Sequence, residues 1–109
     1  MKNVKITVVD TPLNQKLVDK YGMPGTSSCP KHKQGDTFIS RGGEKPDGFC
    51  DEAWNSITRY SIALSAGATH FWDDWVAADR TALATCADAF RPVAFLLQTI
   101  ENEGPDRKG

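Results

Sequence analysis

The chain has 109 residues, of which 39% are hydrophobic and 25% charged, so it can form one hydrophobic core but not two. Thirteen basic and fourteen acidic residues leave a formal net charge of −1, which excludes a strong general attraction to nucleic acid or anionic membranes. No apolar run approaches the roughly 20 residues of a membrane span, and the N-terminal residues lack the apolar region of a signal peptide. We therefore expect a single cytoplasmic domain over residues 1–103 and a flexible tail over 104–109.

The N-terminal residues predict a strand followed by a short helix. Apolar and polar residues alternate over residues 4–9, which is the period of a half-buried strand. Thr11 is the expected N-cap of the helix, Pro12 its first residue, and Gly22 the residue that ends it. We therefore expect a helix over about residues 12–21.

A long irregular segment separates this helix from the next strand. The sequence MPGTSSCPKHKQG is rich in Gly, Pro and Ser and shows no hydrophobic period, so it predicts a loop. This loop contains Cys29 and His32. The sequence DTFISR after it predicts a short strand, and GGEKPDG predicts a turn region.

The longest predicted helix covers about residues 50–66. Its apolar face is formed by residues at helical spacing, namely Trp54, Ile57, Ser61 and Leu64. Gly67 is the expected C-cap. Cys50 follows the turn sequence Pro-Asp-Gly, so its thiol is expected at the helix N-terminus, where the unpaired N–H groups and the helix dipole favour a thiolate.

Two strands complete the predicted fold. The sequences TALATCAD and RPVAFLLQTIE predict strands joined by a tight turn around residues 88–91. The element order is then β-α-β-α-β-β. It predicts a small α+β domain with a mainly antiparallel sheet of three or four strands, on which both helices pack.

The cysteines are the strongest chemical feature of the sequence. Cys29, Cys50 and Cys86 fall on three separate predicted elements, and their odd number argues against a secreted disulfide framework. Cys29 and His32 form half of a zinc-binding motif, which Cys50 and Cys86 would complete to a Cys₃His set. Because thiolates select soft and borderline metals, these four residues predict a site for zinc or an iron–sulfur centre.

Two other roles are open for the same cysteines. Free cysteine is often buried as a small apolar side chain, and Cys86 fits that description best. Alternatively, Cys50 is the reactive group of a metal-free thiol enzyme or redox protein, with Cys29 or Cys86 as the resolving thiol. Such an enzyme needs a base, and only His32 and His70 can provide an imidazole.

The remaining candidates lie around the expected site. Trp54 and Arg91 would wall the site or balance its charge, although a structural ion pair of Arg91 with Asp88 or Glu52 is the simpler role. The aromatic sequence HFWDDW, residues 70–75, predicts a cover for the core or a contact in a homo-oligomer, with or without a small-molecule ligand. No phosphate-binding loop, nucleotide fingerprint or basic aromatic surface is present, so nucleic acid is not an expected partner.

Four segments together resemble the TIGR04076 family of small bacterial and archaeal proteins. They are VKITV, the pattern C-P…G-D-x-F over residues 29–38, PDGFCDEAWNSI, and TCADAFRPVAFLLQTIE. The resemblance extends from about Val4 to Glu101. It implies a cysteine at each of the positions Cys29, Cys50 and Cys86, and therefore a site that the three share.

The chain also departs from the family pattern. The family has two adjacent cysteines where this chain has Thr85 and Cys86, so one sulfur ligand is missing. His32 does not belong to the pattern, which leaves His70 or water as the implied fourth ligand. The family carries no established activity, so the resemblance implies the position of a site and not its reaction.

Overall fold

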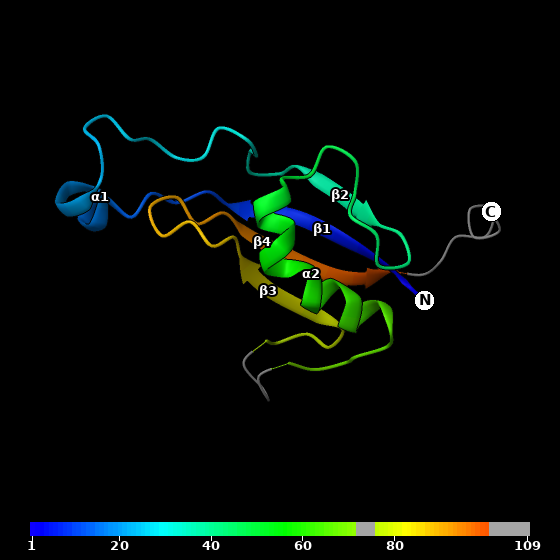
Figure 1. The fold of residues 1–109 in the computed structure, drawn as a ribbon. Coiled ribbons are helices and arrows are strands. Elements are labelled where there is room, and N and C mark those ends of the chain that lie inside the picture. The colour runs from blue at the N-terminus through cyan, green and yellow to red at the C-terminus, as the bar shows by residue number, and fades with distance from the viewer. Residues whose placement is uncertain (72–75, 101–109) are drawn as a thin grey trace.

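Four strands and two helices make up the part of the chain that the structure, a computed structural model, describes, residues 1–71 and 76–100. The strands form one antiparallel sheet in the order β2-β1-β4-β3. In chain order the elements are β1 (Asn3–Asp10), α1 (Gln15–Tyr21), β2 (Thr37–Ser40), α2 (Asp51–Ser65), β3 (Thr81–Thr85) and β4 (Ala94–Ile100). This arrangement, drawn in Figure 1, confirms the predicted α+β class and the β-α-β-α-β-β order.

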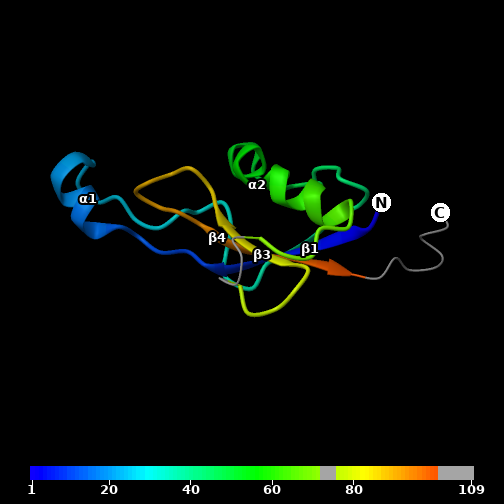
Figure 2. The same ribbon diagram turned by 90° about the horizontal axis from the view of Figure 1, so that it is seen from below.

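The core lies between α2 and one face of the sheet. In Figure 2 the helix covers this face and crosses the central strands. Every second residue of β1 faces α2, and the same alternation on β4 buries Phe95 and Leu97. From α2, Ala53, Ile57 and Leu64 are buried against the strands, as the helical spacing predicted.

Ser61 contributes a buried hydroxyl to this core that has no hydrogen-bond partner. We expect Ser61→Ala to raise the free energy of unfolding by about 1 kcal/mol, because alanine removes an unsatisfied polar atom and has the higher helix propensity. Ser65 provides a matched control on the same helix, since its hydroxyl donates a hydrogen bond of 2.7 Å to the Lys2 carbonyl. Ser65→Ala is expected to lower the stability in the same urea titration. A loss of stability in both variants would contradict the prediction.

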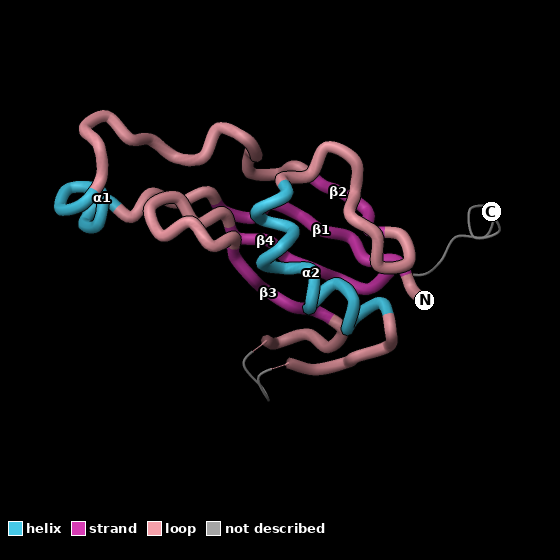
Figure 3. The backbone as a smooth tube through the Cα atoms, viewed as in Figure 1, coloured by secondary structure: helices cyan, strands magenta, loops and turns pink. Residues whose placement is uncertain are grey.

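The first helix differs from the sequence-based expectation in its start and in its place. It begins at Gln15 with Asn14 as the N-cap, and not at Pro12 with Thr11. It lies beyond the end of the sheet and not on its face, as Figure 3 shows. Val18 is its one buried residue, so its two turns offer little apolar surface for the sheet to cover.

The second helix ends close to where the sequence predicted. Cys50 is the N-cap, Ala66 is the C-cap, and Gly67 follows with a φ of +106°. This left-handed conformation is one that glycine adopts without steric cost. The expected tail, residues 104–109, and most of the aromatic segment, residues 72–75, lie outside the described residues. Across residues 1–71 and 76–100, no helix combines the length and apolar character needed to cross a membrane.

Candidate functional site

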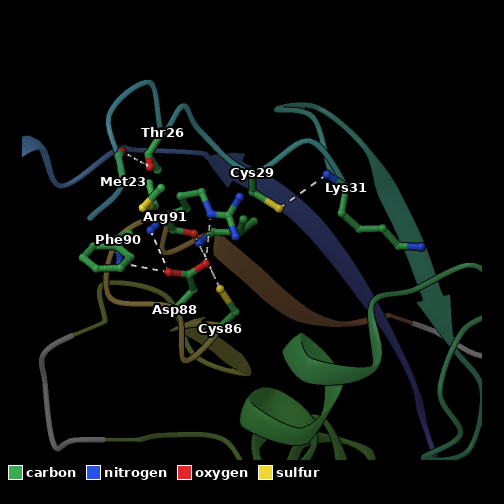
Figure 4. A network of polar contacts seen from close by, with 9 residues as sticks. Met23, Thr26, Cys29, Lys31, Cys86, Asp88, Phe90 and Arg91 are labelled. Atoms are coloured by element: carbon green, nitrogen blue, oxygen red, sulfur yellow. Dashed lines mark hydrogen bonds and ion pairs between the residues drawn. The ribbon is translucent and has the colours of Figure 1, made fainter. Parts of the chain in front are cut away.

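A pocket of about 320 Å³ opens at the N-terminal end of α2. Its walls come from the loop before β2, the first turn of α2 and the connection between β3 and β4. The lining residues are Cys29, His32, Cys50, Glu52, Ala53, Cys86, Ala87, Asp88, Arg91 and Val93. All three cysteines therefore lie around one pocket, and Figure 4 shows two of them beside the Asp88–Arg91 pair.

A turn places Cys50 at this pocket. The Phe49 N–H donates to the Pro46 carbonyl at 3.3 Å, and Gly48 takes a φ of +77°, which explains the Pro-Asp-Gly sequence. The ammonium of Lys45 donates to the Phe49 carbonyl at 3.3 Å. Cys50 then caps α2 with an extended backbone, and its side chain makes no capping hydrogen bond. Its thiol is therefore available to the pocket, close to the positive end of the helix dipole.

The other two sulfurs accept main-chain hydrogen bonds. The Lys31 N–H lies 3.4 Å from Cys29 Sγ, and the Val93 N–H lies 3.3 Å from Cys86 Sγ. The Cys86 thiol in turn lies 3.8 Å from the Arg91 carbonyl, at donor distance. These contacts hold both sulfurs at the wall of the pocket.

His32 lines the pocket but is buried, with 3% of its surface exposed. Its Nε2 accepts a hydrogen bond of 3.3 Å from the Cys50 backbone N–H, so the ring is neutral and carries its proton on Nδ1. Burial lowers the pKa of His32 below 6.5; Asp36 opposes this shift and Lys31 adds to it. His32 was predicted as a metal ligand, and this stays a prediction; in the structure its Nε2 accepts the backbone N–H of Cys50.

A cluster of aromatic rings supports His32. Its ring centroid lies 5.1 Å from that of Phe49, 5.3 Å from Phe38 and 5.8 Å from Phe95. Trp54 packs edge-on against Phe49 at 6.0 Å and is not among the residues that line the pocket. Phe49 and Phe95 belong to the hydrophobic core, and all three cysteines pack against that core as partly buried side chains.

Arg91 and Asp88 form an ion pair beside the pocket. Arg91 Nε lies 3.1 Å from Asp88 Oδ2, and Asp88 Oδ1 accepts the N–H groups of Phe90 and Arg91. Burial raises the pKa of Asp88, but these hydrogen bonds and the Arg91 charge lower it more, so the pKa lies below its ordinary value. The pair fixes the turn between β3 and β4, which is the structural role considered for Arg91.

Two other predicted residues have different positions in the structure. His70 lies past the C-terminal end of α2, at the opposite end of the helix from the pocket, and is exposed. Glu52 lines the pocket, although from the sequence it was expected only as a possible ion-pair partner of Arg91. Its place in the first turn, two residues after the N-cap Cys50, is the signal that could have identified it.

The described residues around the pocket do not form a ready metal-binding group. Within residues 1–71 and 76–100, no three side chains of the His, Cys, Asp and Glu types are close enough together to hold a metal ion as they stand. All three cysteines line the pocket, but they do not form such a group in this structure. Cys29 lies in a loop without regular structure, whereas Cys50 begins α2 and Cys86 follows β3.

Comparison of the chain with protein-family models, with curated proteins and with solved structures gave no significant match. The resemblance to the TIGR04076 family therefore stays a prediction from the quoted segments. What the structure defines is a class of protein: a small α+β domain with a pocket bordered by three cysteines.

Proposed function

We propose that this pocket binds a soft metal centre, zinc or an iron–sulfur cluster, through the thiolates of Cys29, Cys50 and Cys86. The observation that carries the proposal is that three cysteines from three separate segments line one pocket. Thiolates in such a group select zinc and iron–sulfur centres over hard cations.

The surroundings of the sulfurs support the same proposal. Two sulfurs accept backbone N–H groups, and the third belongs to the N-cap of a helix of 15 residues. Hydrogen bonds from the backbone to ligand sulfurs are a common feature of thiolate metal centres. The fourth position would belong to water or to a substrate, because His32 Nε2 is hydrogen-bonded to Cys50 and His70 lies at the other end of α2.

The metal content of untagged protein tests this proposal. Protein purified without a chelator, once in air and once anaerobically, is expected to contain about one zinc per chain, or iron with matching sulfide. Cys50→Ser should abolish this content, because serine is a poor ligand for soft metals. Glu52→Gln is the matched control: it lines the same pocket without contributing sulfur, and it should keep the metal.

Two results would contradict the proposal. One is full metal stoichiometry in Cys50→Ser, which would place the metal elsewhere. The other is wild-type protein that is empty under both conditions and does not take up added Zn²⁺ or Co²⁺. The second result would favour a metal-free thiol enzyme. In that case Cys50, whose side chain makes no capping hydrogen bond, is the reactive group. One cysteine should then be alkylated much faster than the other two.

A further inference from the structure

The open edge of the sheet at β3 carries a second inference. In the described residues, β3 pairs on one side only, with β4, and Figure 1 shows it at the margin of the sheet. Its five residues contain no charge and no proline, which are the usual devices that prevent a sheet edge from pairing. Leu83 in its centre is 47% exposed. The strand is thus suited to pair with another strand.

The hydrogen-bond pattern fixes which groups point outward. The Thr99 N–H donates to the Arg80 carbonyl, and the Cys86 N–H donates to the Val93 carbonyl. In an antiparallel ladder such pairs recur at every second residue, so the even-numbered residues of β3 bond to β4. The backbone groups of Thr81, Leu83 and Thr85 therefore point away from the sheet.

The sequence of this strand is palindromic. Thr-Ala-Leu-Ala-Thr, residues 81–85, is the same in both directions. Antiparallel pairing with a second copy, with Leu83 on the two-fold axis, would set each Thr81 opposite a Thr85 and each Leu83 opposite its equivalent. These are the residues whose backbone groups point outward, so all of them would find partners. A shift by one residue would set outward groups against inward ones.

The charges at the two ends of the strand are compatible with this pairing. Arg80 precedes β3 and lies close to Asp79, whereas Asp88 follows it and pairs with Arg91. Each end therefore carries one charge of each sign, so antiparallel pairing of two copies brings no unbalanced like charges together. A groove lined by Ser56, Arg59, Tyr60 and residues 83–87 runs along the α2 side of β3. The two-fold axis would place the two grooves next to each other, beneath the two copies of α2.

We propose that the protein forms a symmetric dimer through β3, in which two four-stranded sheets join into one of eight strands. The interface is isologous, since the same strand contributes to both sides. In this register Arg80 of the second copy lies at the level of Cys86, so the partner borders the cysteine pocket. The dimer itself does not depend on what the pocket binds.

Sedimentation equilibrium of matched variants tests the dimer. Wild-type protein is expected at the mass of two chains, and Leu83→Lys at the mass of one, because two ammonium groups would face each other at the axis. Ile62→Lys is the matched control, since Ile62 is 46% exposed and lies on α2; this variant should remain a dimer. Far-ultraviolet circular dichroism of Leu83→Lys should equal that of the wild type.

Amide hydrogen exchange tests the register. The Leu83 and Thr85 amides should become protected as the protein concentration rises, while the Ala84 amide, which faces β4, should be protected at every concentration. A monomeric wild type at high concentration would overturn the proposal. So would a Leu83→Lys variant that still forms a dimer, or Leu83 and Thr85 amides that exchange equally fast at all concentrations.

Discussion

Replacement of Phe95 by alanine is expected to lower the free energy of unfolding by about 3–5 kcal/mol. Phe95 is fully buried at the centre of the sheet, on β4. Its ring centroid lies 5.2 Å from that of Phe49 and 5.8 Å from that of His32. The alanine variant leaves a cavity that neither neighbour can fill without moving, because Phe49 belongs to the turn before α2 and His32 accepts the Cys50 N–H. Urea unfolding followed by circular dichroism measures the loss.

Tyr21 supplies the aromatic control for this variant. Its side chain is 68% exposed at the end of α1, so Tyr21→Ala should change the stability by no more than about 0.5 kcal/mol. A loss below about 1 kcal/mol in Phe95→Ala would mean that the aromatic cluster can repack and does not hold the pocket. Phe95→Ala would also remove packing from Phe49, the residue before Cys50, so the mutation would affect the position of Cys50 at the pocket.

The elements that local patterns specify were predicted well. Strand β1 follows from an apolar period of two, and α2 follows from a helical period bounded by Cys50 and Gly67. The place of α1 did not follow from its sequence. The Asn14 N–H donates to the Phe90 carbonyl at 2.8 Å, and this contact joins the start of the helix to the turn between β3 and β4. Such a contact between distant segments leaves no trace in the sequence period.

The sequence predicted that the three cysteines converge, and they do line one pocket, whereas their role as metal ligands stays a prediction. The sequence indicated the three cysteines, and the antiparallel topology brings the end of β3 and the start of α2 to the same pocket. The role of His32 could not be predicted, because it depends on the backbone N–H of Cys50, which is a neighbour only in the folded chain. The spacing of Cys29 and His32 suggested two ligands; in the fold the buried imidazole lines the pocket and also packs against the aromatic core.

Acidification is expected to destabilise the protein through His32. The pKa of the buried ring lies below 6.5 because of desolvation, in spite of Asp36 and with a contribution from Lys31. The unfolded chain therefore takes up a proton at higher pH than the folded chain does. The contribution of the neutral His32 ring to the free energy of unfolding is complete above about pH 6.5. It is lost as the pH falls toward the pKa of the folded state. Each unit between the two pKa values corresponds to about 1.4 kcal/mol.

The structural cause is a reversal of hydrogen-bond roles. A protonated imidazole donates from both nitrogens, so its Nε2–H would face the Cys50 N–H that it now accepts. His32→Gln should remove the loss of stability between pH 7.5 and 5.5, since a neutral amide oxygen can accept this N–H at every pH. His70→Gln is the control, because His70 is exposed and lies far from the pocket; it should keep the wild-type dependence.

Urea titrations at steps of half a pH unit measure this dependence in the three proteins. Carboxylates titrate mostly below this window, so a slope between pH 7.5 and 5.5 reports on histidine. An unchanged slope in His32→Gln would show that the buried ring does not carry the effect. If the slope vanishes there and persists in His70→Gln, the buried ring that accepts the Cys50 N–H carries the pH dependence of the stability in this window.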